Sequence, residues 1–319
     1  MTDFKLWRFI LDRIIQSQSV ILLCVLESNG SSPGRQGFKM AVASDGIYGS
    51  IGGGIMEHKF VEMAKEKLRS LPDDPLVRKQ IHNKSAKKNQ SGMICSGEQT
   101  IVLFPMTKIY TDTIEKILNC LENNRNGRLK ISPESISFSE NDDGSDYYFD
   151  MKSEDDWQYQ ETLGYKNHLY IIGGGHCAFS FSRLMSHMDF YIHLFEERKG
   201  LNTFDQNTFV IEKKIVSDYS VLKNLIPSGD NIYTVIMTFG YRTDDIALRS
   251  LIGKDFKYFG VLGSQSKKEK MFEEWRRDNL PVEKLKKIYA PVGFSINSQS
   301  PEEIAISIAA EIISVKNRK

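Results

Sequence analysis

Residues 168–178 read HLYIIGGGHCA, and this stretch decides the fold of the second half of the chain. An apolar, strand-like run ends in a glycine turn of the form Gly-x-Gly-x-x-Ala, which begins at Gly173 and Gly175. Helical spacing resumes directly after the turn, so the order is strand, glycine turn and helix. This order is typical of a Rossmann-like dinucleotide fold. The same glycines can also serve only the packing of helix against strand.

Two more residues near this turn are candidates for contact with a ligand. A second strand-like run, residues 190–195, ends at Glu196, which follows the turn by about twenty residues, where a ribose-binding carboxylate belongs. His176 begins the helix and is either close to a ligand or a partly exposed surface histidine. We predict that Gly173, Gly175, His176 and Glu196 belong to a nucleotide site.

The rest of the second half supports an α/β fold with a mainly parallel sheet. Strand-like and helical stretches alternate at residues 231–237, 244–252 and 258–262. The loops that follow the two strands lie where open sheets bind their ligands. In the later loop, Gly263, Ser264 and Lys267 either cradle an anion or form an ordinary helix cap.

The first half contains a second glycine-rich turn, at residues 49–58, which read GSIGGGIMEH. Apolar residues recur at helical spacing after the glycines, so the turn precedes a helix whose first N–H groups suit a phosphate or another anion. A tight connection that binds nothing has the same pattern. The candidate cofactor-binding residues in this turn are Ser50, Gly52, Gly53, Gly54 and Glu57.

A loop rich in small residues precedes this turn. Residues 1–18 predict an amphipathic helix without the apolar core of a signal peptide, and residues 20–26 predict a buried strand. Residues 27–37 then predict a loop that contains Arg35. A guanidinium on such a loop can bind phosphate or carboxylate in a bidentate manner, although it can equally be solvated.

Cys95 is the candidate catalytic residue. It lies between Gly92 and Gly97, just before a strand predicted at residues 100–105. An accessible thiol near N–H dipoles can be a nucleophile, a sulfur carrier or a metal ligand. The alternative is a small residue packed in a turn.

Composition excludes several classes of protein. The net charge of +1 over 319 residues shows no bias toward nucleic acid or membrane, and no stretch is long enough to cross a bilayer. The 4 cysteines have no zinc-site spacing, which indicates a cytoplasmic setting with reduced thiols. Cys24 and Cys120 lie in apolar runs and are predicted to be core residues.

The chain is long enough for two domains. Residues 125–161 are polar and acidic, but apolar and aromatic residues recur among them too often for a disordered linker. We expect one or two β-hairpins that bridge the halves. The expected domains are therefore residues 1–163 and 164–319.

Six ordered motifs together resemble the XdhC/CoxI family over nearly the whole chain. They are residues 30–35, residues 49–54 with Glu57, Cys95 with Gly97, residues 173–176, Gly263 and Ser264 with Lys267, and residues 291–311. Each motif alone is weak, but their order and spacing in one chain are specific. The resemblance implies a first domain of the XdhC/CoxI type and a second, Rossmann domain.

The resemblance also implies a function. Such a protein is an accessory factor that binds molybdenum cofactor (molybdopterin), supports its sulfuration and delivers it to a molybdenum hydroxylase of the xanthine dehydrogenase type. It would be a cofactor chaperone rather than a catalyst, with a cysteine desulfurase as a second partner and a homodimer as its state. Arg35 and the glycine turn would hold the anionic end of the cofactor, with Cys95 near the metal or the transferred sulfur.

The chain departs from the family pattern at three places. Cys95-Ser96-Gly97 stands where the family usually has Cys-Gly-Gly, and Thr238-Phe239 stands where it has Thr-His. No role for that histidine can therefore be carried over. Residues 196–198 read EER in place of two aspartates before arginine, which keeps a carboxylate for ribose.

Two other functions compete with this one. The Rossmann pattern alone would fit an NAD(P)-dependent oxidoreductase, but beyond isolated residues no arrangement of side chains for hydride transfer is recognisable. A scaffold whose Rossmann domain senses a nucleotide and whose first domain docks a hydroxylase is the third possibility.

Overall fold

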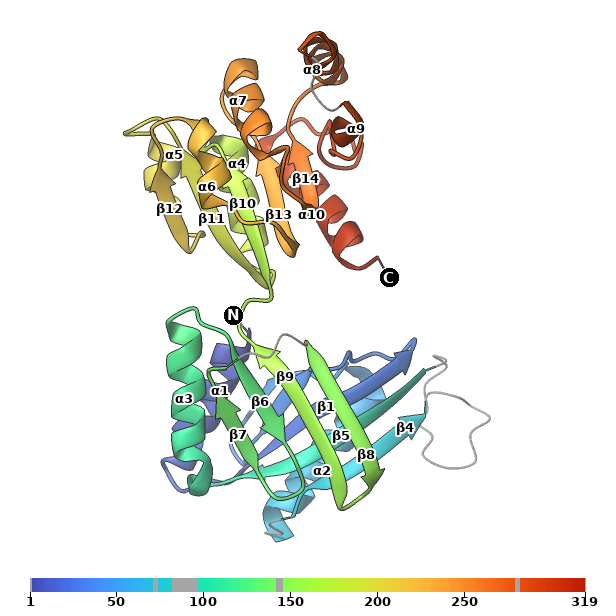
Figure 1. Ribbon diagram of the computed structural model, residues 1–319. Helices are drawn as coiled ribbons and strands as arrows, with labels where there is room; N and C mark the ends of the chain where they lie inside the picture. Colours follow the sequence, from blue (N-terminus) through green and yellow to red (C-terminus); the bar gives the residue numbers. More distant parts are fainter. Residues whose placement is uncertain (1, 71–73, 82–96, 142–145, 279–281, 319) are drawn as a thin grey trace. The chain divides into compact units, whose positions relative to one another are not determined.

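The computed structural model describes residues 2–70, 74–81, 97–141, 146–278 and 282–318. The chain divides into two compact units, Met1–Gly164 and Tyr165–Lys319, each of which combines helices with β-sheet (Figure 1). The predicted α/β fold class is confirmed.

The first unit is built around a five-stranded antiparallel sheet in the order β3-β2-β1-β5-β4. Its strands are β1 (Val20–Gly30), β2 (Lys39–Val42), β3 (Ile47–Gly49), β4 (Leu76–Ile81) and β5 (Gly97–Met106). Strand β1 is buried on both faces, since Leu22 and Cys24 contribute to one core cluster and Ile21 and Leu23 to another. Burial on both faces explains why residues 20–26 are continuously apolar instead of alternating.

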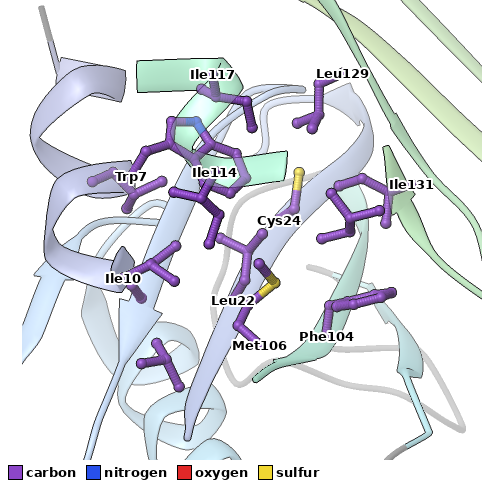
Figure 2. Packing of buried hydrophobic residues seen from close by; sticks show 14 of the residues in the cluster. Trp7, Ile10, Leu22, Cys24, Phe104, Met106, Ile114, Ile117, Leu129 and Ile131 are labelled. Atoms are coloured by element: carbon purple, nitrogen blue, oxygen red, sulfur yellow. The ribbon is translucent and has the colours of Figure 1, made fainter. Parts of the chain in front are cut away.

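Further elements cover both faces of this sheet. Helix α2 (Gly54–Ser70) packs on one face through Met56 and Phe60. The other face is covered by helices and by a second sheet of order β7-β6-β9-β8. These elements are α1 (Thr2–Ile14), η1 (Lys108–Tyr110), α3 (Thr111–Glu122), β6 (Gly127–Ile131), β7 (Ile136–Ser139), β8 (Tyr147–Ser153) and β9 (Asp156–Leu163). Figure 2 shows this core, in which Trp7 and Ile114 from two helices and Cys24 of the sheet belong to one cluster of buried side chains.

The structure differs from the sequence-based expectation at one place in this unit. Strand β1 continues to Gly30, four residues beyond its predicted end, because β5 pairs with it up to Gly30 and Gly97 around a β-bulge. The hairpins expected in residues 125–161, within the expected first domain, form the second sheet of this unit, and side chains such as Leu129 and Tyr159 pack into its core. Cys24 and Cys120 are fully buried, as predicted.

The second unit contains a five-stranded parallel sheet in the order β12-β11-β10-β13-β14. Its strands are β10 (Asn167–Ile172), β11 (Phe190–Glu196), β12 (Glu212–Ile215), β13 (Gly229–Ile236) and β14 (Phe256–Val261). Its helices are α4 (His176–Met185), α5 (Asn202–Asp205), η2 (Tyr219–Val221), α6 (Leu222–Leu225), α7 (Tyr241–Leu251), α8 (Gln265–Arg277), α9 (Val282–Leu285) and α10 (Pro301–Lys316).

Helices cover both faces of this parallel sheet, as a Rossmann-like domain requires. Residues of α4 and α10 pack on one face, and residues of α7, α8 and α9 pack on the other. The strand order reverses between β10 and β13, which makes the carboxyl ends of these strands the place where such folds bind ligands. At the start of α10, Ser300 and Glu303 form the predicted capping box, with Pro301 in the first turn.

Candidate functional site

Three segments of the first unit meet so closely that only glycine fits between them. A Cβ atom placed on Gly34 would lie 2.0 Å from the carbonyl oxygen of Ile51, and one on Gly52 would lie 2.4 Å from the nitrogen of Gly34. At the start of β5, a Cβ on Gly97 would lie 2.7 Å from the backbone of Ser31 and Ser32. The Arg35 loop, the glycine turn before α2 and the start of β5 therefore form one continuous surface.

Gln99 joins these segments and was not predicted as a site residue. Its side chain is 1% exposed, and its amide nitrogen donates to the carbonyl of Gly34 at 2.9 Å and that of Ile51 at 3.5 Å. The feature of the sequence that could have identified Gln99 is its position directly before the apolar strand predicted to begin at Thr100. A buried side-chain amide needs hydrogen-bond partners, and here backbone carbonyls from two other segments supply them.

Glu57 organises the glycine turn from within. One of its carboxylate oxygens accepts hydrogen bonds from Ser50 Oγ at 2.6 Å and from the N–H groups of Ile51 and Gly53, both at 2.9 Å. The N–H of Gly52 donates to Ser50 Oγ at 3.1 Å. Burial acts to raise the pKa of Glu57, but the hydrogen bonds outweigh it and lower the pKa. In this structure the N–H of Gly53, which was predicted to bind a ligand anion, therefore binds the protein's own carboxylate, and the N–H of Gly52 binds the Ser50 hydroxyl.

Arg35 is exposed beside this turn. One guanidinium nitrogen donates to the carbonyl of Gly30 at 3.1 Å, a contact that holds the loop without neutralising the charge. Helix α2 begins at Gly54, and the first N–H groups of a helix have no partner within it. The prediction for Cys95 falls outside the described residues, which resume at Gly97.

In the second unit, the predicted glycine turn lies at the reversal of strand order. Gly173 has φ +106°, and a Cβ there would lie 2.4 Å from the carbonyl oxygen of Met237, so the turn after β10 packs directly on the end of β13. Gly175 is the N-cap of α4 and borders open space, and His176 is exposed at the first helical position. The turn and its helix thus have the geometry that dinucleotide folds use.

Glu196 has a different environment from the one expected of a ribose-binding residue. It is fully buried, and it accepts hydrogen bonds from the N–H of Gly174 at 2.7 Å and from that of Glu197 at 2.9 Å. Arg198 donates to both carboxylate oxygens, at 2.9 and 2.8 Å. A ribose hydroxyl could reach this carboxylate only by displacing Arg198, because a buried carboxylate with this set of donors has no side left for a ligand.

The substitution Glu196→Gln is expected to change how the second unit responds to acid. Burial would raise the pKa of this carboxyl, but the hydrogen bonds from Arg198 and Gly174 lower it to about 2. Because the pKa is lower in the folded protein than the ordinary value of 4.5, the ionised carboxyl stabilises the fold fully above pH 4.5. This contribution is lost as the pH falls toward 2. The contribution at neutral pH is on the order of 3 kcal/mol. Denaturant unfolding followed at Trp275 should show a less stable variant at pH 7, with a flatter decline between pH 4.5 and 2. Identical acid profiles would contradict this role.

Ser264 caps a helix, and Lys267 pairs with a buried carboxylate. Ser264 is the N-cap of α8 and accepts a hydrogen bond from the N–H of Lys267 at 3.3 Å. The Lys267 ammonium is paired with Asp244, which is 1% exposed, and donates to the carbonyl of Leu262 at 2.7 Å. Burial raises the pKa of Asp244 despite this pair. Of the two alternatives for this loop, an anion cradle or a helix cap, the structure contains the helix cap. A Cβ atom on Gly263 would lie 2.5 Å from the Lys267 side chain.

Two family models match this chain. The model described as the XdhC and CoxI family matches residues 14–77, and the model described as the XdhC Rossmann domain matches residues 169–312. These ranges contain the glycine turn before α2 in the first unit and the turn after β10 in the second. The chain belongs to the XdhC and CoxI family.

Relatives of this XdhC/CoxI chain include proteins that are longer. An uncharacterized protein of Escherichia coli strain K12, YqeB, is 23% identical over 300 residues, which is 92% of this chain and 43% of that protein. A protein of Bacillus subtilis strain 168, described as a probable subunit of xanthine dehydrogenase, is 31% identical over 84 residues, which is 26% of this chain and 23% of that protein. The chain thus spans less than half the length of the curated relatives it matches.

A solved structure shows the same fold. It is the crystal structure of a protein described as a xanthine dehydrogenase from Bacillus halodurans. The two chains superpose with a TM-score of 0.72 at 21% identity, and the match covers 100% of this XdhC/CoxI chain and 97% of the other. Among the described residues, no helix has both the length and the apolar character needed to cross a membrane.

Proposed function

We propose that this protein is an accessory factor of a molybdenum hydroxylase of the xanthine dehydrogenase type. In this proposal it binds molybdenum cofactor, supports its sulfuration and delivers it to the apo-enzyme in the cytoplasm. The observation that carries the proposal is the single surface of the first unit that the Arg35 loop, the glycine turn and the start of β5 form together. Membership of the XdhC and CoxI family and the name of the Bacillus subtilis relative support it.

The residues of this surface fit an anionic, flat cofactor, with one restriction. The carboxylate of Glu57 fills the inside of the glycine turn, so a phosphate placed there would meet a negative charge. Arg35 lies outside that turn, and it would hold the phosphate together with the first N–H groups of α2. Ile55, which is 60% exposed at the same helix end, offers an apolar contact to the ring system. The cofactor itself supplies the metal and the sulfur ligands.

In this proposal Cys95 takes part in the sulfuration of the cofactor. It precedes Gly97 by two positions, and Gly97 packs on the Arg35 loop. On this basis Cys95 contacts the metal or the sulfur that a cysteine desulfurase supplies. The homodimer and the desulfurase partner follow from the family resemblance and belong to the same proposal.

The alternative of an NAD(P)-dependent oxidoreductase or a nucleotide sensor rests on the second unit. Its glycine turn and His176 are open to a ligand, which favours a nucleotide there. The hydrogen bonds between Glu196 and Arg198 count against it, because they occupy the expected ribose-binding carboxylate.

Cofactor retention tests the proposal directly. Protein would be purified from cells able to make molybdenum cofactor, and bound pterin would be measured by oxidation to its fluorescent derivative. We expect near-stoichiometric pterin in the wild type. Arg35→Gln should lower its affinity about 10- to 100-fold, because a hydrogen bond to a charged group is worth roughly 1.5–3 kcal/mol. Cys95→Ala should lower retention and the activation of a partner hydroxylase.

Arg8→Gln is the matched control, since it removes the same charge from an exposed position on α1. It should retain pterin like the wild type. Equal retention in Arg35→Gln and Cys95→Ala would remove both residues from the site. Absence of pterin from the wild type, together with tight binding of a nicotinamide nucleotide, would replace the proposal with the alternative.

A further inference from the structure

The carboxyl end of β11 in the second unit differs from the ribose-binding end of an NAD site. Glu196 Oε1 accepts hydrogen bonds from the N–H groups of Glu197 and Arg198, both at 2.9 Å. The same oxygen lies 3.3 Å from Tyr219 OH, and Oε2 accepts from the N–H of Gly174 at 2.7 Å. The Arg198 side chain adds one bond to each oxygen. These donors occupy both oxygens, so a ribose 2′-hydroxyl has no acceptor here.

The guanidinium of Arg198 has donors that Glu196 does not use. Its contacts with the carboxylate involve Nε at 2.9 Å and Nη2 at 2.8 Å, which form one edge of the planar group. The edge formed by Nη1 and the other hydrogen of Nη2 points away from Glu196. Within the described ranges this second edge has no acceptor, and the side chain is 36% exposed. Hydrogen bonds to Glu196 raise the pKa of Arg198, so the group is charged.

A second cation and an aromatic ring accompany Arg198. Lys199 follows directly in the sequence and is exposed, and in the described part of the chain no carboxylate pairs with it. Phe239, in the loop after β13, is 57% exposed, and its ring centroid lies 4.5 Å from Arg198 Cζ. Strand β10 lies between β11 and β13, so the arginine and the ring meet across the end of the strand that leads into the glycine turn. Cations bind phosphate, and an exposed ring offers a surface on which a base can stack.

The glycine turn fits the other part of a dinucleotide. Gly174 packs against the same carboxylate, since a Cβ atom on it would lie 3.3 Å from Glu196 Oε2 and 3.0 Å from Phe204. Gly175 borders open space, because a Cβ atom there would have no described neighbour within 4 Å. Helix α4 begins directly after it, at His176. A pyrophosphate can therefore approach the backbone at Gly175, close to the carboxyl end of β11, where dinucleotide folds place the adenosine ribose.

We propose that the second unit binds a dinucleotide whose adenosine ribose carries a 2′-phosphate, the chemistry of NADP(H), and selects it over the form with a free 2′-hydroxyl. The second edge of Arg198 donates to the phosphate, and the Lys199 ammonium pairs with it. Glu196 is a positioning residue, because its two oxygens hold the guanidinium plane in place. The same hydrogen bonds that count against an NAD-type ribose therefore prepare the cation for a phosphate.

The charges at the end of β11 decide the side from which the phosphate binds. The charge of Glu196 is balanced by Arg198 and by backbone N–H groups, and the residue is fully buried. Glu197 is partly exposed and would repel a phosphate on its own side of the chain. The phosphate therefore binds at the outer edge of Arg198. Its binding weakens as salt is added, because the two cations that hold it are partly solvated.

Calorimetric titration of the full chain tests the inference with two matched pairs of probes. Adenosine 2′,5′-bisphosphate and adenosine 5′-phosphate differ only in the 2′-phosphate, and NADPH and NADH differ in the same group. We expect the 2′-phosphorylated member of each pair to bind about 10- to 100-fold more tightly, as hydrogen bonds to a charged group predict.

Variants of the two cations separate the phosphate contact from the fold. Arg198→Lys keeps a cation for Glu196 but has no second edge, so the preference for the 2′-phosphate should fall to about 3-fold or less, with unchanged affinity for adenosine 5′-phosphate. Lys199→Gln should lower the preference by about 2- to 5-fold. Lys257→Gln, which removes an exposed charge near the amino end of β14, is the matched control and should leave the preference unchanged. Denaturant unfolding followed at Trp275 verifies that each variant is folded.

Three results would overturn the inference: NADH binding as tightly as NADPH or more tightly, no binding of NADPH or of the bisphosphate, or an unchanged preference in both Arg198→Lys and Lys199→Gln. The inference goes beyond the proposed function and does not rest on it, because the proposed function assigns the pterin to the first unit. A protein that retains pterin but binds no NADPH would therefore overturn only this inference.

Discussion

The substitution Lys39→Met is expected to lower the free energy of unfolding of the first unit by about 3–5 kcal/mol. The side chains of Lys39 and Glu161 are 4% and 3% exposed, and their charged atoms are 2.8 Å apart. Lys39 also donates to the carbonyl of Gly37 at 2.9 Å and contacts Asp3 at 3.4 Å. Burial acts to lower the pKa of this ammonium, but Asp3 and Glu161 outweigh it and raise the pKa, so the group is charged. Methionine would leave the Glu161 carboxylate buried without its cation.

Denaturant unfolding followed at Trp7 and Trp157, which are both buried in the first unit, measures this effect. The double variant Lys39→Met, Glu161→Gln should recover part of the loss, because it buries no charge in place of the pair. Lys130→Met, at an exposed position of β6, should change stability by no more than about 0.5 kcal/mol. If the double variant were as unstable as the single one, the loss would come from packing rather than from the unpaired carboxylate.

The substitution Gly34→Ala should be the most harmful single methyl group in the candidate site. The added carbon would lie 2.0 Å from the carbonyl oxygen of Ile51 and 2.5 Å from Gln99 Nε2. Overpacking against side chains usually costs about 1–3 kcal/mol, and a clash with backbone belongs at the upper end of that range. The Arg35 loop would have to move away from the glycine turn. We therefore expect a destabilisation of about 3 kcal/mol together with reduced pterin retention.

Gly46→Ala is the control for this variant. Its nearest neighbour would be Arg13 Nη2 at 3.5 Å, an ordinary contact, so the expected change is within about 0.5 kcal/mol. Stability would be read from the same tryptophan fluorescence, and pterin from the oxidised fluorescent derivative. A Gly34→Ala protein with wild-type stability would mean that the two loops are not in contact.

Much of the fold could be predicted from local patterns. The apolar run at residues 20–26, the helix after Gly54 and the strand, turn and helix around Gly173 are all present in the structure. These features depend on neighbours a few residues away, so the order of residue types carries them. The length of strand β1 was underestimated because local patterns do not show distant strand pairing. Residues 27–30 look like a loop by composition, and only pairing with β5 keeps them extended.

The candidate site was predictable in part. Arg35, the glycine turn and Gly97 do share one surface, but Gln99, which connects them, was missed because its partners are distant in the chain. Glu57 and Glu196 were identified as candidate site residues, but their hydrogen-bond partners were not predicted. Both accept hydrogen bonds from the backbone of the turns they were expected to serve.

Local patterns were enough to predict most of the larger elements and their order, the α/β class and the family, because spacing and glycine position act over short stretches of chain. The tertiary structure alone decided the partner of each buried charge: Lys39 for Glu161, Arg198 for Glu196 and Lys267 for Asp244. The physical reason is that burial makes an unpaired charge costly, while the partner that relieves this cost can come from any part of the chain that folding brings near.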